Sequence, residues 1–232
     1  MNMFKITALT LAIATTACSL TAMAAETAQI TVKGAVFPSA CAISVDGSVD
    51  FGNLKKNELQ EQTKNQNAYQ LGYKPVGFNI QCKSAAKVAL SAQADTPVSG
   101  NPTMGVVSYL SDTDKALRAE PGQLASLGAL EGEDIGYFTV MLASATLDSK
   151  DAELISSKNG GSSWSAVSGT AEHLMYQDGS VFHGWGKDAA PQEATNISGI
   201  MTVSAALNVK VVEELKDVVN FNTGTTLSLH YL

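Results

Sequence analysis

The sequence is poor in the side chains from which catalytic and metal centres are usually built. Only three of its 232 residues are cysteine and only three are histidine. No two of the histidines, His173, His183 and His230, stand at a spacing typical of zinc ligands. No Gly-x-Ser-x-Gly motif of a serine hydrolase occurs. We therefore expect a protein that is not an enzyme and that holds neither a metal ion nor a cofactor.

Basic residues are also scarce. The chain has 15 Lys and Arg against 22 Asp and Glu, which gives a formal net charge of −7. An acidic chain of this kind repels nucleic-acid phosphates and anionic lipid headgroups. Long apolar runs are missing as well, since no stretch approaches the roughly 20 residues that a membrane-spanning helix requires. We expect no nucleic-acid partner and no membrane-spanning helix.

The N-terminus has the pattern of a secretory signal peptide. Lys5 is the only charged residue among the first 25, and the apolar or small residues 6–20 follow it. The tripeptide Ala22-Met23-Ala24 then provides a small-x-small cleavage site. We predict a signal peptide over residues 1–24 and one domain over residues 25–232. Lipidation at Cys18 is the less favoured alternative, because Thr15 stands where a lipoprotein site has leucine.

The cysteines form an even pair once the signal peptide is removed, since Cys18 leaves with it. An even pair in an oxidising compartment is expected to be a disulfide, here Cys41–Cys82. A metal site would need more ligands, and a redox pair would need the C-x-x-C spacing. A bridge that closes a loop of about 40 residues should contribute about 4 kcal/mol to stability.

Short runs of alternating apolar and polar residues dominate the chain, and amphipathic helical patterns are few. Alternation with period two is typical of strands that have one buried face. Polar and Gly-rich connections separate these runs, and residues 218–224 read as one of these connections with a turn at Asn222-Thr223-Gly224. The pattern predicts an all-β sandwich. The predicted strands are residues 29–37, 42–45, 49–52, 76–82, 87–92, 137–146, 200–212 and 227–231.

Three segments together resemble the pilins of chaperone–usher fimbriae. They are GAVFPSACAISVDGSVDFGNL from Gly34, VGFNIQC from Val76, and the C-terminal LSLHYL. The tail resembles even more closely a group of uncharacterised fimbria-associated periplasmic proteins that end in a similar -YL. The resemblance covers residues 29–92 and 200–232 and is faint across the loop-rich middle, residues 93–199.

The resemblance implies an immunoglobulin-like, pilin-type sandwich that lacks its final strand. Such a sandwich exposes a sheet edge and an apolar groove, and it is completed by a strand from another protein. The implied partners are a periplasmic chaperone, an outer-membrane usher and other fimbrial subunits, and Leu227, Leu229 and Tyr231 would face them. The implied location is the periplasm and then a fimbrium on the cell surface.

The segment before Cys41 leaves other interpretations open. If residues 29–37 form the first strand, only residues 25–28 remain to act as a donor strand. The chain could then be a subunit that accepts a strand at the tip or the end of a filament. It could also be a self-complete soluble periplasmic protein.

Aromatic residues gather in one part of the middle of the chain, at Trp164, Tyr176, Phe182 and Trp185. Aromatic rings on Gly-rich loops can stack on sugar faces, so these four residues are candidate glycan contacts of a tip adhesin. The alternative is a hairpin that turns at Asp178-Gly179 and packs the rings inward, because the D-G dipeptide is a strong hairpin signal.

Overall fold

The computed structural model describes residues 40–232. The predicted signal peptide, Cys18 and the predicted strand over residues 29–37 lie outside the described residues. Among the residues described, no helix is long and apolar enough to cross a bilayer.

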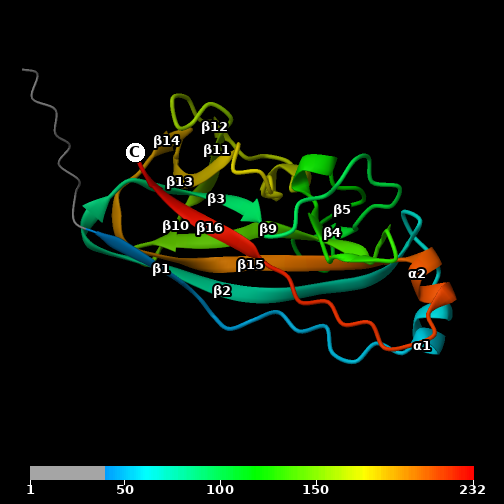
Figure 1. Ribbon diagram of the computed structural model, residues 1–232. Helices are drawn as coiled ribbons and strands as arrows, with labels where there is room; N and C mark the ends of the chain where they lie inside the picture. Colours follow the sequence, from blue (N-terminus) through cyan, green and yellow to red (C-terminus); the bar gives the residue numbers. More distant parts are fainter. Residues whose placement is uncertain (1–39) are drawn as a thin grey trace, which may run out of the picture. The chain divides into compact units, whose positions relative to one another are not determined.

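The chain forms two antiparallel sheets that face each other, which confirms the all-β sandwich (Figure 1). The first sheet consists of β1 (Cys41–Val45), β2 (Ala68–Ala86), β15 (Ala194–Asn208), β9 (Gly136–Leu147) and β10 (Lys150–Asp151) in that order, with β6 (Ala125–Ser126) also paired to β9. The second consists of β12 (Ser165–Ala166), β11 (Glu153–Ser157), β13 (Phe182–Lys187), β3 (Val88–Ala94) and β16 (Thr225–Tyr231), with β14 (Ala190–Pro191) paired to β13.

Smaller elements fill the connections. The two-stranded sheets are β4 (Ser108–Tyr109) with β5 (Lys115–Ala116), and β7 (Ala129–Leu130) with β8 (Glu133–Asp134). The helices are α1 (Lys56–Gln60) and α2 (Val209–Glu214), and the 3-10 turns are η1 (Pro121–Gln123) and η2 (Thr170–His173). Residues 93–199, which were expected to be rich in loops, thus contribute β9, β11 and β13 to the two main sheets.

The main core lies between the two sheets. Ile80 of β2, Leu90 of β3 and Ile197 of β15 are fully buried there. Trp185 of β13 stacks on Phe78 of β2 with ring centroids 5.6 Å apart, and this pair joins one sheet to the other. Large apolar side chains removed from water in this way supply most of the favourable free energy of folding.

A second apolar cluster covers the other face of the first sheet. It packs Met104, Val106 and Leu124 of the connection before β9 against Tyr137 and Met141 of β9. Strand β9 therefore buries both of its faces, which explains why its sequence YFTVML is almost continuously apolar rather than alternating.

The disulfide Cys41–Cys82 is present, as predicted. It joins residues that are directly opposite in the β1–β2 ladder, with their Cα atoms 3.9 Å apart. The bridge therefore fixes the edge strand β1 to the long strand β2.

Three local predictions need correction. Residues 49–52 form no strand, since the chain between β1 and α1 has no strand partner among the described residues. The strand predicted over residues 200–212 ends at Asn208, whose side chain accepts a hydrogen bond from the Lys210 N–H and caps the start of α2. The predicted hairpin at Asp178-Gly179 is a turn only. The residues before it do not pair with β13, and Gly179 N–H instead donates to the carbonyl of Ala92.

Candidate interaction groove

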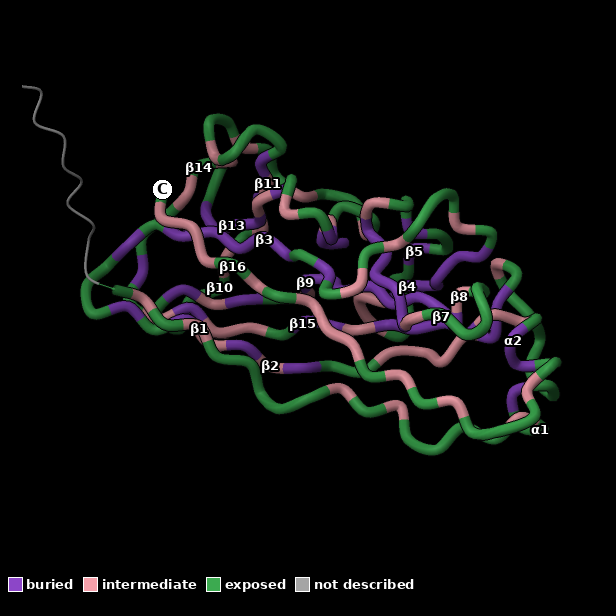
Figure 2. Tube along the Cα trace, viewed as in Figure 1, coloured by how far each residue is buried: buried purple, intermediate pink, exposed green. Residues whose placement is uncertain are grey.

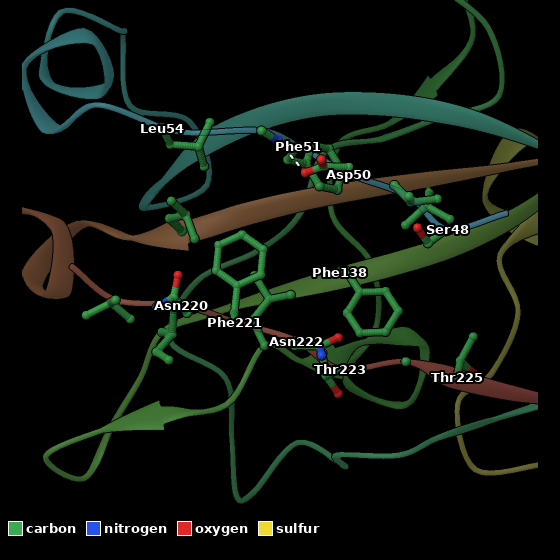
Figure 3. A pocket seen from close by; sticks show the side chains of 18 of the residues that line it. Ser48, Asp50, Phe51, Leu54, Phe138, Asn220, Phe221, Asn222, Thr223 and Thr225 are labelled. Carbon is green, nitrogen blue, oxygen red and sulfur yellow. Dashed lines mark hydrogen bonds between the residues drawn. The ribbon is translucent and has the colours of Figure 1, made fainter.

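A groove of about 970 Å³ opens along one side of the sandwich. We call it the edge groove. Its floor consists of apolar side chains from the first sheet, among them Val76, Phe138, Val140, Met201 and Val203. Two flanking segments line its sides, residues 43–54 and residues 215–227. Figure 3 shows side chains of both flanks with the ring of Phe138 between them.

Each flank has the pattern of a strand. In the first flank Val49 and Phe51 are half-buried, and the residues between and beside them are exposed. In the second flank Val219 and Phe221 are half-buried on either side of an exposed asparagine. This alternation is visible along both segments in Figure 2. Period-two burial means that one side of each segment faces the groove and the other faces solvent.

Between β1 and α1, and between α2 and β16, the flanks nevertheless lack the pairing of strands. No backbone–backbone hydrogen bond joins residues 48–54 or residues 216–223 to any other described residue. Strand β16, which continues the second flank, pairs with β3 on one side and with no described strand on the other. Apart from the Gly52 N–H, which donates to Asp50 Oδ1 at 2.7 Å, the backbone groups of residues 48–54 and 216–223 have no hydrogen-bond partner among residues 40–232. Backbone groups of this kind can bind an extended chain.

One end of the groove is closed by the two helices. Both flanks lead to α1 and α2 at the same end (Figure 1). Lys56 Nζ donates to the carbonyl oxygens of Glu213 and Leu215 at 2.7 and 3.3 Å. Lys64 Nζ lies 2.5 Å from the Glu213 carboxylate, and this hydrogen bond is the main reason that the pKa of Glu213 is lowered. We call this group of contacts the helix clasp.

The C-terminal strand places the three predicted contact residues on one side. Leu227 lines the edge groove, and Leu229 and Tyr231 are half-buried against the main core. The Tyr231 hydroxyl also accepts a hydrogen bond from the Cys41 N–H at 2.6 Å. Leu227 is thus the only one of the three that lines the groove.

The four candidate glycan contacts do not form one surface. Trp185 is 2% exposed and belongs to the main core. Tyr176 donates from its hydroxyl to Glu120 Oε2, and this bond raises the pKa of Tyr176 to about 12. Only Trp164 and Phe182 come together, since both rings lie beside Gly161.

The histidines make local contacts. His173 Nδ1 lies 2.6 Å from the carbonyl oxygen of Leu142. His183 is buried, its Nδ1 has no hydrogen-bond partner, and burial lowers its pKa to about 4. His230 stacks on Phe182 with centroids 3.9 Å apart, and its Nε2 lies 2.8 Å from Ser91 Oγ. Within residues 40–232 no three His, Cys, Asp or Glu side chains are grouped as metal ligands.

Sequence reasoning missed the second flank of the groove. Residues 218–224 were read as a connection, although Val219 and Phe221 alternate with exposed residues. The signal was the V-N-F spacing directly before β16. It matches the V-D-F spacing of the first flank, which was recognised as alternating.

Comparison with family models gives a match over part of the chain. A family model described as a protein of unknown function, DUF1120, matches residues 30–139. Over the described residues the match runs from β1 through β8 and ends inside β9, so it does not reach the second flank or β16. No curated protein matches the chain.

Proposed function

We propose that this protein is a fimbrial or fimbria-associated structural protein that accepts an extended strand from a partner in its edge groove. The observation that carries the proposal is the pair of flanks, which have strand-like burial but no strand partner. The partner would be a periplasmic chaperone, an usher or a neighbouring subunit.

Backbone geometry supports this function. An extended chain laid between residues 48–54 and 216–223 would find on both sides N–H and C=O groups that have no partner among the described residues, except for the Gly52 N–H. Pairing of this kind supplies affinity without demanding a particular sequence. An exposed edge that stays unpaired is an aggregation hazard, so a protein that retains one is expected to have a partner for it.

The apolar lining supports it as well. Val45 is 41% exposed and Val218 is 85% exposed, although both are large apolar residues beside the groove. A partner strand with alternating apolar side chains would cover the floor at Phe138 and Met201. Each apolar side chain buried in this way contributes about 1.5–3 kcal/mol.

The sequence and the disulfide support a periplasmic location. Residues 1–24 have the signal-peptide pattern, and the Cys41–Cys82 bridge suits an oxidising compartment such as the periplasm. The fimbrial part of the proposal rests on the resemblance of the cysteine motifs and of the LSLHYL tail.

Periplasmic co-expression tests the proposal. We expect a fimbrial chaperone encoded beside this gene to raise the yield of the chain and to copurify with it. In the complex, amide hydrogen exchange should slow at residues 216–223 and along the free edge of β16. A chain that is a stable monomer alone, with those amides already protected and its yield unchanged by the chaperone, would refute the proposal.

A matched pair of variants localises the contact. Val219→Asp places a charge on the groove side and should abolish copurification. Ser228→Asp makes a similar change at an exposed residue of β16 that is not among the lining residues, and should leave copurification intact. Formation of the disulfide and an unchanged circular dichroism spectrum check that both variants fold.

A further inference from the structure

A short segment of the chain, residues 168–173, contacts the buried side chain of His183. The segment contains the 3-10 turn η2, and we call it the η2 segment. His183 lies on β13 and is 1% exposed. Its Nε2 lies 3.3 Å from the carbonyl oxygen of Glu172. Because a carbonyl oxygen only accepts hydrogen bonds, this contact requires the proton on Nε2 and leaves Nδ1 unprotonated.

The unprotonated Nδ1 of His183 is buried and has no hydrogen-bond partner among residues 40–232. A second proton on the ring has to add at this atom. It would create a positive charge and an N–H donor at a place where no described acceptor reaches it, and burial of such a group is strongly unfavourable. Burial is accordingly the main reason that the pKa of His183 is lowered to about 4. The ring can take up a proton at mildly acidic pH only if Nδ1 first reaches water.

The charged groups around this ring do not compensate for a proton. On η2 they are His173, whose positive charge would oppose a second one, and the Glu172 carboxylate, which accepts hydrogen bonds from within the η2 segment. On β10, Asp151 is exposed and lines a cavity of about 210 Å³ with His173 and Trp185. The residues opposite His183 on β3 and β11 are uncharged. No carboxylate among residues 40–232 forms an ion pair with His183.

The η2 segment is attached to the sheets mainly through histidine rings. Ala171 and Glu172 at its centre are exposed. Two hydrogen bonds join the segment to the sheets. One is the contact between the Glu172 carbonyl and His183, and the other is donated by His173 Nδ1 to the Leu142 carbonyl of β9 at 2.6 Å. A single turn of this length is not stable in water by itself, so its order depends on these contacts.

The chain on both sides of the η2 segment is anchored by backbone hydrogen bonds. The Val167 N–H donates to the Leu154 carbonyl of β11, and the Met175 N–H donates to the Val140 carbonyl of β9. Neither bond involves residues 168–173. The fold therefore permits a local opening that detaches these residues and leaves both sheets paired.

We propose that the η2 segment is an acid-released latch: protonation of His183 at Nδ1 detaches residues 168–173 from β13 while the two sheets stay folded. This inference does not depend on the proposed function. In the open state the ring is in water and has its ordinary pKa of 6.5, against about 4 when the latch is closed. The closed state is therefore fully favoured above pH 6.5 and is lost as the pH falls towards 4. From these two pKa values, opening becomes about 20-fold more favourable between pH 7 and pH 5.

Amide hydrogen exchange of the full exported chain, resolved by NMR, tests the latch. The reporters are the N–H groups of Gly169, Glu172 and Leu174, whose hydrogen-bond acceptors lie within the η2 segment. After correction for intrinsic exchange rates, we expect their protection factors to fall by about 20-fold between pH 7 and pH 5. At each pH the protection factors should be insensitive to a low concentration of urea, because a local opening exposes little surface.

Two variants identify the titrating group. His183→Gln retains an N–H group that can donate to the Glu172 carbonyl, but it does not titrate. In this variant the protection factors of the three reporters should be the same at pH 7 and pH 5. His173→Gln is the matched control on the segment itself, and it should retain most of the pH dependence of the wild type.

Three results would overturn the latch. The first is protection of the reporters that does not change with pH in the wild type. The second is protection that changes with pH but also falls steeply in low urea, since His183 would then be reached only by global unfolding. The third is a pH dependence that persists in His183→Gln and disappears in His173→Gln. The urea measurement uses only the wild type, so it decides the question even if His183→Gln does not fold.

Discussion

The backbone N–H of Cys41 donates to the hydroxyl of Tyr231 at 2.6 Å, so the first described strand of one sheet is bonded to the last strand of the other. The two residues are 190 positions apart in sequence. Because Cys41 is also bridged to Cys82, this contact ties β16 to the disulfide. The Cys41–Tyr231 hydrogen bond and the helix clasp thus connect the two sides of the edge groove, one at each end.

Removing the Tyr231 hydroxyl should loosen this connection. Tyr231→Phe keeps the ring but leaves the Cys41 N–H without its acceptor. We expect the free energy of unfolding in urea to fall by about 1 kcal/mol. The control is Tyr73→Phe, because its hydroxyl bonds to Asp112 at an exposed site and its loss should cost less. Equal effects of the two variants would argue against a special role of the Tyr231 contact.

The disulfide should account for a large share of the stability. The bridged cysteines are 41 residues apart, for which loop-closure entropy predicts a loss of about 4 kcal/mol in the variant with both cysteines replaced by alanine. Urea denaturation of the oxidised wild type and of the double variant measures the difference. A loss below about 1 kcal/mol would mean that the unfolded chain is compact even without the bridge.

The elements that could be predicted are those whose signal is local. The C-terminal strand β16 has alternating residues in sequence. The Cys41–Cys82 disulfide could be predicted from the even number of cysteines that remain after signal-peptide removal and from an oxidising compartment. Strand β9 was recognised, but its burial on both faces could not be, because the residues that cover it, such as Met104 and Leu124, come from a connection without periodicity of its own.

Tertiary contacts determine the two features that the sequence did not predict, which are helix α2 and the second flank. Residues 209–212 continue the apolar pattern of β15, yet they form a helix because the Asn208 side chain caps it and the apolar residues Val211 and Val212 face the groove end. The second flank of the edge groove has alternating burial without backbone pairing to a described strand. A sequence pattern can indicate the alternation but not the missing pairing. Only three-dimensional placement brings Phe51 and Phe221 to opposite sides of one groove.

His183 should make the protein sensitive to mild acid. Burial lowers its pKa from 6.5 to about 4 in the folded state. The unfolded chain therefore binds a proton at a higher pH than the folded chain, so stability is fully present above pH 6.5 and is lost as the pH falls towards 4. Between pH 7 and 5 we expect a loss of about 2 kcal/mol in urea denaturation.

A variant assigns this loss to His183. His183→Gln removes the titrating group and should flatten the stability profile between pH 7 and 5, whatever its stability at pH 7. His230 also has a lowered pKa from partial burial, so His230→Gln is the control and should flatten the profile less. Carboxylates with a lowered pKa, such as Glu172, change the free energy of unfolding only at more acidic pH. An unchanged slope in His183→Gln would contradict the assignment.

Trp185 and Trp164 should differ sharply in their effect on stability. Trp185 is enclosed in the core against Phe78, so Trp185→Ala should lower the free energy of unfolding by about 3–5 kcal/mol. Trp164 lies on a loop and donates its indole N–H to the Gly161 carbonyl, and Trp164→Ala should cost only about 1 kcal/mol. Comparable losses would mean that the loop is part of the cooperative core. A glycan-binding assay of the folded Trp164→Ala variant then tests that ring separately from folding.

The uncomplexed edge groove should bind a hydrophobic dye in the native state. Exposed apolar surface of this kind binds anilinonaphthalene sulfonate and enhances its fluorescence, whereas well-packed native domains do not enhance it. Phe221→Ser removes a half-buried ring from the groove lining and should reduce the enhancement by about half, at a small cost in stability. Asn222→Ser, on the exposed neighbour, should change neither quantity. Dye binding that is equal in wild type and Phe221→Ser would place the apolar surface elsewhere.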